Sequence, residues 1–194
     1  MGRAGKDDLH LRTAPVEAVV REAAEPHMSR GKTVLFDAAP ENDTNLAQPT
    51  IMRRPEIIHG LRNLIQNAVD FAHERVEIDV TWTSSDVSVR IADDGPGIPA
   101  SVIGRIGDPF VRRRRRSQEL RNRPNYEGMG LGLFIAKTLL ERSSAELIFV
   151  NGDQTGSATE HVGAVVTVTW PRASIESSRS NLGSALGENE LNLP

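Results

Sequence analysis

The chain has 194 residues, 38% of them hydrophobic, and a formal net charge of −3. This length can supply the hydrophobic core of one domain, and the mildly acidic balance argues against a surface built for nucleic acid. Cysteine is absent, which excludes disulfides, thiolate metal sites and thiol catalysis. No apolar run approaches the ~18 residues that span a bilayer, and no signal peptide is evident, so we expect a soluble, cytoplasmic segment.

Polar ends flank one predicted domain. Residues 1–13 are polar and are expected to be loose, whereas residues 172–194 are rich in Ser, Asn and Gly and are expected to be disordered or to form a loosely docked tail. The predicted domain therefore spans residues 14–171. Its first elements are a helix over Pro15–Met28, short strands over Thr33–Phe36 and Thr50–Arg53, and a loop over Asp37–Pro49 between the strands.

The stretch Glu56–His73 is predicted to be an amphipathic helix, with Pro55 suited to its first turn. Asn63 and Asn67 are four residues apart, so both amides project from one side of that helix. An amide oxygen is a neutral, hard ligand that suits a magnesium ion whose other ligands are water and phosphate. Taken alone, such a pair is more often a solvated face. The apolar stripe consists of Ile57, Leu61, Leu64, Ile65, Ala68 and Phe71.

Two pairs of alternating apolar and polar segments predict antiparallel strands with one buried face. Together with the helices, they predict an α+β two-layer sandwich, in which about three helices cover one face of a mixed, mostly antiparallel sheet of about five strands. The segments are Arg75–Thr83 with Asp86–Ala92, and Ala145–Val150 with Ala164–Trp170, separated by a helix over roughly Leu131–Arg142.

Two glycine-containing motifs are candidates for ligand binding. Asp93-Asp94-Gly95-Pro96-Gly97-Ile98 follows a strand, and a carboxylate there can accept a hydrogen bond from an exocyclic amine. Taken alone, the run is more often a tight turn that ends a strand. Gly128-Met129-Gly130-Leu131-Gly132-Leu133 leads into a helix whose N-terminal dipole suits phosphate. No Lys-Ser/Thr follows it, so it is not a Walker P-loop, and no predicted strand precedes it, which argues against a Rossmann turn.

An Asn-rich helix, a DxGxG turn and a GxGLGL run, in that order, resemble the ATP-binding domain of sensor histidine kinases, which are GHKL or Bergerat-fold ATPases. The resemblance covers about residues 9–171. The segments GLRNLIQNAVDFA, IGRIGDPFVRRRR and YEGMGLGLFIAKTLLERS look closest to the redox-responsive RegB/PrrB/ActS kinases. The resemblance therefore implies that the chain binds ATP together with Mg²⁺.

The resemblance also implies individual roles. Asp93 would contact the adenine amino group, and a guanine carbonyl facing it would leave two acceptors unpaired. Asn67, with Asn63 beside it, would hold magnesium. Asn63 stands where hydrolytic relatives carry a glutamate that activates water; an amide is a poor base, so we expect slow hydrolysis. The other predicted ATP-binding residues are Asp70, Phe71, Gly95, Gly97, Ile98, Phe110, Gly128, Met129, Gly130, Leu131, Gly132 and Leu133.

Asp70 departs from the kinase pattern, in which lysine or arginine is common at this position. A carboxylate cannot bind phosphate directly; pairing with an arginine of the lid and helping to hold magnesium both remain open. Between the glycine motifs, Ala100–Glu127 is predicted to be a lid over ATP. Arg112 heads the five arginines Arg112–Arg116 and is the first candidate to reach the phosphates during catalysis, while most of the run is expected to be solvated.

The five histidines offer no good phosphoacceptor. His10 has the family's spacing to Pro15, but it lacks an acidic neighbour and lies too close to Asn63 for a dimerisation hairpin to intervene. His27, His59, His73 and His161 are expected to be surface or structural residues. The acceptor histidine is therefore predicted to lie outside this chain.

The predicted function is that of the ATP-binding catalytic domain of a two-component sensor histidine kinase, which phosphorylates a histidine on an absent dimerisation domain for relay to a response regulator. We expect the full protein to be a homodimeric bacterial inner-membrane kinase with this part in the cytosol, and the isolated domain to be monomeric. The alternatives are a hydrolytic GHKL ATPase, an anti-sigma-type serine kinase and a non-catalytic nucleotide-binding module. No nucleic-acid partner is expected, since the arginines lack flanking aromatics and a base-reading helix.

Overall fold

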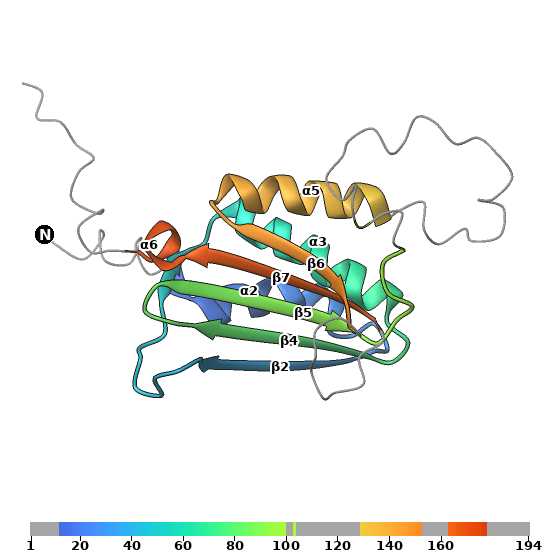
Figure 1. Cartoon of the computed structure of the whole chain (residues 1–194), viewed down its shortest axis with the longest axis horizontal. Coiled ribbons are helices and arrows are strands. Elements are labelled where there is room, and N and C mark those ends of the chain that lie inside the picture. The colour runs from blue at the N-terminus through green and yellow to red at the C-terminus, as the bar shows by residue number, and fades with distance from the viewer. Residues whose placement is uncertain (1–11, 100–102, 104–128, 153–162, 178–194) are drawn as a thin grey trace, which may run out of the picture.

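The computed structural model describes residues 12–99, 103, 129–152 and 163–177. Five strands form one sheet in the order β2-β4-β5-β7-β6, and Figure 1 shows helices α2, α3 and α5 together on one side of it. The predicted α+β two-layer sandwich is confirmed. The elements are β2 Thr33–Pro40, β4 Arg75–Trp82, β5 Asp86–Asp93, β6 Glu146–Asn151, β7 Ala164–Pro171, α2 Val16–Ala24, α3 Pro55–Phe71 and α5 Met129–Arg142.

Alternation along the strands explains the two layers. In β4, Val76, Ile78 and Val80 are fully buried, whereas Asp79 between them is partly exposed. Asp79 forms a 2.8 Å ion pair with Arg90, its cross-strand neighbour on β5, on the polar face. The apolar face packs on the helices and forms the core. Only the β2–β4 pairing is parallel, so the sheet is mixed and mostly antiparallel, as predicted.

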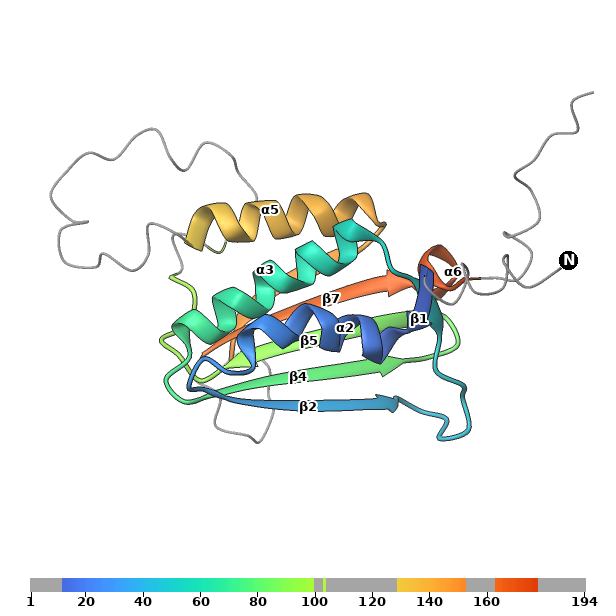
Figure 2. The ribbon, with the colours of Figure 1, turned by 180° about the vertical axis from the view of Figure 1, so that it is seen from behind.

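Helix α3 is the middle helix of the layer and packs against both α2 and α5 (Figure 2). Its contact with α5 is close at Gly60, where a Cβ atom would lie 2.5 Å from Cγ of Leu140. Any larger residue at position 60 would push the two helices apart. This contact fixes the asparagine-bearing helix relative to the glycine-rich helix, and so brings two of the predicted motifs side by side.

Tertiary pairing extends one strand beyond its predicted end. Strand β2 continues through Asp37–Pro40, where the sequence predicts loop, because these residues pair in parallel with residues 79–82 of β4. Edge pairing outweighs the weak strand propensity of Asp and Pro here. The predicted helix over Pro15–Met28 is also shorter: α2 ends at Ala24, and a 3₁₀ turn, η1 (Glu25–His27), follows around Pro26.

Both predicted loose ends contain ordered residues. Thr13 belongs to β1 (Thr13–Pro15), which pairs with β3 (Thr50–Met52). At the other end, α6 (Arg172–Ile175) docks through Ile175, which is 2% exposed, and through Arg172, whose guanidinium donates to the carbonyl of Thr83 at 3.0 Å. Disorder is therefore wrong for residues 172–177, while the predictions for 1–11 and 178–194 lie outside the described residues.

No described helix is both long and apolar enough to cross a membrane. Of the described histidines, His27 is 5% exposed, and the structure gives neither ring nitrogen a hydrogen-bond partner among the described residues. Burial, followed by the nearby Arg30, lowers the pKa of His27. A buried neutral imidazole under α3 fits the expectation that this residue is structural.

Candidate nucleotide-binding site

Asp93 is the last residue of β5 and is only 4% exposed. Its Oδ1 accepts hydrogen bonds from the backbone N–H groups of Gly95, at 2.9 Å, and Ala164, at 3.2 Å. Burial raises the pKa of Asp93, while these two backbone donors oppose that rise. A carboxylate can accept about four hydrogen bonds, so a donor from a ligand can still be accommodated.

Asp94, the next residue, has a structural role. It accepts hydrogen bonds from the backbone N–H groups of His73, Glu74 and Arg75 at 2.8–3.1 Å. Partial burial would raise the pKa of Asp94, but these backbone donors outweigh it and hold the pKa below its ordinary value. Asp94 therefore ties the end of β5 to the start of β4, whereas Asp93 lines a cavity.

A small cavity lies between α3, α5 and the ends of β5 and β7, and Asp93 lines it. Its volume is about 30 Å³. The lining residues are Leu64, Asn67, Ala68, Phe71, Ile91, Asp93, Gly97, Ile98, Leu133, Ala164 and Val166, six of which the sequence analysis selected.

Asn67 lies in the wall of this cavity, next to α5. Asn67 donates from Nδ2 to the carbonyl oxygen of Asn63 at 2.8 Å, which leaves its Oδ1 as the atom suited to a cation. Gly132 on α5 packs against the same amide, since a Cβ atom there would lie 3.0 Å from Nδ2 of Asn67. The structure thus brings the asparagine helix and the start of the glycine-rich helix together.

The turn after Asp93 requires its two glycines for different reasons. At Gly95, a Cβ atom would lie 2.3 Å from the carbonyl oxygen of Phe71, so the turn passes too close to α3 for a side chain. Gly97 has φ of +75°, in the left-handed region, and a Cβ atom there would lie 2.8 Å from Oδ1 of Asn151. Both glycines therefore place Ile98 in the cavity wall.

Sequence reasoning missed three residues at the base of the β6–β7 hairpin. Asn151 bonds to Ile98, Ala164 donates to Asp93, and a Cβ atom at Gly163 would lie 1.9 Å from the backbone oxygen of Asp93. The only signals were an Asn-Gly pair and a glycine at the two ends of a segment predicted as a polar loop. Such signals predict a turn and do not indicate what it contacts.

Asp70 has a partner outside the predicted lid. Its Oδ1 is 2.7 Å from Nη1 of Arg30, and both side chains are 45% exposed. Asp70 lies three residues beyond Asn67 on α3, so the pair is about one helical turn from the paired amides. The lid arginines, Arg112 among them, together with Phe110, Gly128 and the rest of Ala100–Glu127 apart from Ile103, lie outside the described residues.

The donor set fits magnesium bound together with a phosphate chain. No group of three His, Cys, Asp or Glu side chains suited to a metal occurs in the part of the chain that the structure describes. Magnesium commonly takes one or two protein oxygens and completes its shell with water and phosphate. The Oδ1 of Asn67 at the cavity wall, with Asn63 one turn earlier, fits that arrangement. Gly132, near the start of α5, packs against the amide of Asn67 in the same region.

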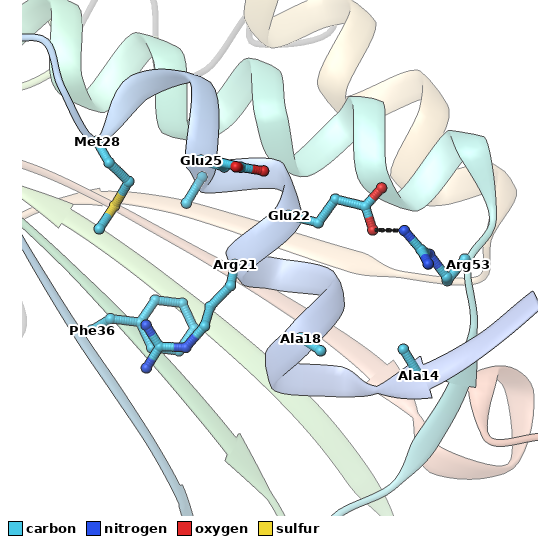
Figure 3. A pocket seen from close by; sticks show the side chains of 9 residues that line it. Ala14, Ala18, Arg21, Glu22, Glu25, Met28, Phe36 and Arg53 are labelled. Atoms are coloured by element: carbon cyan, nitrogen blue, oxygen red, sulfur yellow. Dashed lines mark hydrogen bonds and ion pairs between the residues drawn. The ribbon is translucent and has the colours of Figure 1, made fainter. Parts of the chain in front are cut away.

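A larger hollow of about 500 Å³ lies between α2 and β2, as Figure 3 shows. Arg21 stacks over the ring of Phe36 at 3.9 Å, and Arg53 forms a 2.7 Å ion pair with Glu22 along its rim. None of the predicted nucleotide-binding residues lines this hollow. Cavity volume alone therefore does not identify the site. The predicted nucleotide-binding residues lie instead around the smaller cavity beside Asp93.

Residues 52–174 match the family model described as histidine kinase-, DNA gyrase B- and HSP90-like ATPase. The chain therefore belongs to this family of ATPases, as its three motifs predict. Two solved structures share the fold: the mycobacterial sensor histidine kinase MprB, with a TM-score of 0.59 and 18% identity, and the catalytic domain of histidine kinase ThkA, with 0.57 and 20%. Each covers 82% of this chain, and 95% of either structure is matched.

Within the family, the chain is similar to sensor histidine kinases. It is 57% identical to sensor histidine kinase RegB of Cereibacter sphaeroides (strain ATCC 17023) over 195 residues, which cover 98% of this chain and 42% of RegB. It is also 33% identical over 120 residues to the signal transduction histidine-protein kinase AfsQ2 of Streptomyces coelicolor, covering 62% of this chain and 20% of AfsQ2. The chain thus spans less than half the length of these relatives.

Proposed function

We propose that this chain binds Mg-ATP and transfers the γ-phosphoryl group to a histidine on a separate dimerisation domain, from which it passes to an aspartate of a response regulator. The observation that carries the proposal is the buried carboxylate of Asp93, which shares one cavity wall with Asn67 and Leu133. Asp93 would contact the adenine base and Asn67 would hold magnesium at the phosphates, so one cavity offers a contact for each end of ATP.

The adenine end rests on Asp93. Two backbone donors hold Oδ1 of its carboxylate, so Oδ2 is placed to accept a hydrogen bond from the adenine amino group. Guanine would present a carbonyl oxygen there, and two acceptors in a desolvated cavity would repel each other. The apolar walls from Ile91, Ile98 and Leu133 suit the faces of a purine ring. The domain therefore selects adenine.

The phosphate end rests on amides and backbone. When bound, magnesium would neutralise phosphate charge, held by Oδ1 of Asn67 with Asn63 in support. The first turn of α5 offers its backbone N–H groups and positive dipole end to the phosphates. Arg112 of the predicted lid is our candidate for a cation at the transferring phosphoryl group. Catalysis here is mainly positioning and charge neutralisation.

Asn63 accounts for transfer rather than hydrolysis. It is partly exposed on the same side of α3 as Asn67, where a carboxylate could activate water. An amide cannot accept a proton from water near neutral pH, so bound ATP survives until a stronger nucleophile arrives. An imidazole of the dimerisation domain is such a nucleophile.

The Arg30–Asp70 pair adjusts the charge beside the phosphates. An unpaired carboxylate one turn from Asn67 would repel a triphosphate, and the guanidinium of Arg30 at 2.7 Å neutralises it. We therefore assign Asp70 to the electrostatics of the phosphate end rather than to direct phosphate binding. The exposure of both side chains makes this a small contribution.

The cellular setting is proposed from RegB, whose name describes a sensor histidine kinase. We place the chain in the cytosolic part of a homodimeric bacterial inner-membrane kinase, and expect the isolated chain to be monomeric. Its partners would be its own dimerisation domain and a response regulator.

The test uses the purified chain, radiolabelled Mg-ATP and a separately purified dimerisation domain of RegB. We expect an acid-labile phosphohistidine on the dimerisation domain only when both proteins are present, and none on this chain alone. Rapid multiple-turnover phosphate release would favour the hydrolytic ATPase, and acid-stable phosphoserine on an added protein would favour the serine kinase. Failure to bind ATP or ADP in magnesium would overturn the proposal and leave a non-catalytic module.

A further inference from the structure

We propose that Asn151, at the end of β6, is a positioning residue for the purine site: its side-chain amide clamps the turn that connects Asp93 to Ile98. This inference rests on the proposed function, because it assumes that the cavity beside Asp93 receives the base. Asn151 does not line that cavity itself and would act through Ile98 and Gly97, which do.

The clamp consists of two hydrogen bonds to one residue. Oδ1 of Asn151 accepts from the backbone N–H of Ile98 at 2.7 Å, and Nδ2 donates to the carbonyl oxygen of Ile98 at 3.0 Å. Both polar groups of Ile98 are thereby satisfied by one side chain, 53 residues away in the sequence. Few side chains other than an amide can donate and accept in this paired way. Ile98 itself is 3% exposed and forms part of the cavity wall.

The clamp is shaped to Gly97. With φ of +75° at Gly97, the backbone turns so closely past Asn151 that a Cβ atom would lie 2.8 Å from Oδ1 and 3.1 Å from Cγ of the amide. A side chain at position 97 would displace the amide and break its bonds to Ile98. The glycine of the DxGxG motif therefore makes room for Asn151 as well as for a ligand.

The same hairpin base also holds Asp93. Gly152, next to Asn151, donates to the carbonyl oxygen of Gly163 at 2.8 Å, and Ala164 donates to Oδ1 of Asp93. The turn is thus fastened at its first residue by β7 and at its last by β6. With both ends fixed, the distance between the carboxylate of Asp93 and the wall at Ile98 is set before a base arrives.

Loss of the amide should change recognition as well as stability. Asn151→Ala leaves the N–H and C=O of Ile98 without these partners, so the turn gains freedom that binding must remove again. We expect the affinity for Mg-ATP to fall roughly tenfold and the preference for ATP over GTP to narrow by a similar factor. Asn151→Asp keeps an acceptor for the N–H of Ile98 but sets a carboxylate oxygen against its carbonyl, so it should not restore wild-type binding.

The experiment compares calorimetric titrations of ATP and GTP for the wild-type chain, Asn151→Ala, Asn151→Asp and Ser88→Ala, each with its melting temperature. Ser88→Ala is the matched control, because it removes a partly buried 3.0 Å cross-strand hydrogen bond to Thr169 in the same sheet, away from the cavity. It should lower the melting temperature and leave both affinities unchanged.

A double-mutant cycle with Gly97→Ala completes the test. If the clamp is as described, Gly97→Ala should weaken ATP binding less in the Asn151→Ala background than in the wild type, because the clash with the amide is already gone. Wild-type ATP affinity and ATP/GTP preference in folded Asn151→Ala would overturn the inference. Failure of the wild type to bind ATP would instead overturn the proposed function.

Discussion

The adenine end and the phosphate end of the site are built in different ways. At the adenine end, Asp93 and the turn after it are fixed by hydrogen bonds to Ala164 of β7 and Asn151 of β6, and by one within the turn from Gly95. At the phosphate end, Asn67 donates a hydrogen bond to the backbone carbonyl of Asn63 within α3, and Asp70 forms an exposed ion pair with Arg30. The base reader is therefore assembled in advance, whereas the phosphate groups meet a smaller fixed framework.

This difference suggests a division of labour. Selection between adenine and guanine needs a carboxylate that cannot move away from the wrong base. This requirement accounts for the burial of Asp93 despite its desolvation penalty. Phosphoryl transfer needs groups that can approach charge as it develops, and magnesium supplies much of that charge. Rigid specificity and adjustable electrostatics are thus assigned to different residues around one cavity. The predictions below separate the two ends, beginning with the largest effect.

Replacing the carboxylate of Asp93 should strongly weaken nucleotide binding. In Asp93→Asn, Oδ1 can still accept from Gly95 and Ala164, but the amide nitrogen would face the adenine amino group, donor against donor. We expect ATP affinity to fall roughly a hundredfold or more, measured by calorimetry in magnesium. Asp94→Asn is the control: it weakens the bonds to residues 73–75, so it should lower stability and leave ATP affinity within a few-fold. Equal losses in both variants would remove the distinction between the two aspartates.

Removing the magnesium ligand should affect only the phosphate end. Asn67→Ala should weaken Mg-ATP binding by roughly tenfold and make the remaining affinity nearly independent of magnesium, since Oδ1 is lost. Binding of AMP, which needs little magnesium, should be unchanged. Titrations with and without magnesium test this, with Gln66→Ala on the same helix as the control. An Asn67→Ala variant whose ATP affinity still rises with magnesium as in the wild type would contradict the assignment.

Unpairing Asp70 should have a smaller effect of the same kind. In Arg30→Ala the carboxylate faces the phosphates without its partner, so ATP affinity should drop about threefold, in keeping with exposed ion pairs. The double variant Arg30→Ala/Asp70→Asn should recover it, because the repulsion disappears with the charge. If Arg30 were itself a main phosphate ligand, the double variant would stay weak. Binding at two salt concentrations provides a further check, since screening should shrink the difference.

The two neighbouring aspartates should shift stability with pH in opposite directions. Burial raises the pKa of Asp93, so its carboxyl group binds a proton more tightly in the folded state than in the unfolded state. The resulting contribution to stability is lost as the pH rises from the ordinary pKa of aspartate towards the pKa in the folded state. At Asp94, hydrogen bonds outweigh burial and lower the pKa. The contribution of Asp94 to stability is present above the ordinary pKa of aspartate and is lost as the pH falls towards the pKa in the folded state. Urea unfolding between pH 3 and 7 should therefore show a steeper rise of stability with pH for Asp93→Asn and a shallower rise for Asp94→Asn. The same change of slope in both variants would contradict the two environments.

The sequence predicts the parts of this molecule that are encoded locally. The stripe of α3, the strands around Ser84-Ser85 and the motifs at Asp93 and Gly132 each lie within one short stretch, so periodicity and glycine spacing reveal them. That Asp93 rather than Asp94 is the buried carboxylate also agrees with its place at the end of an apolar strand.

What the sequence does not reveal depends on contacts between distant residues. Asn151 meets Ile98 across 53 residues and Arg30 meets Asp70 across 40, and neither pairing has a local signature. The extension of β2 through Asp37–Pro40 depends on the neighbouring strand, and the docking of Arg172 depends on the carbonyl of Thr83. In each case the tertiary fold brings distant residues together, and in β2 the strand pairing outweighs local propensity.

The central claim is that the carboxylate of Asp93 reads the 6-amino group of adenine. It is tested most directly by comparing the affinities of ATP and of purine riboside triphosphate, which lacks that amino group, for the wild type and for Asp93→Asn in magnesium. The account predicts that the wild type prefers ATP strongly, by roughly a hundredfold, and that the preference largely disappears in Asp93→Asn. Equal affinity of the wild type for the two nucleotides, or a preference that survives in Asp93→Asn, would contradict it.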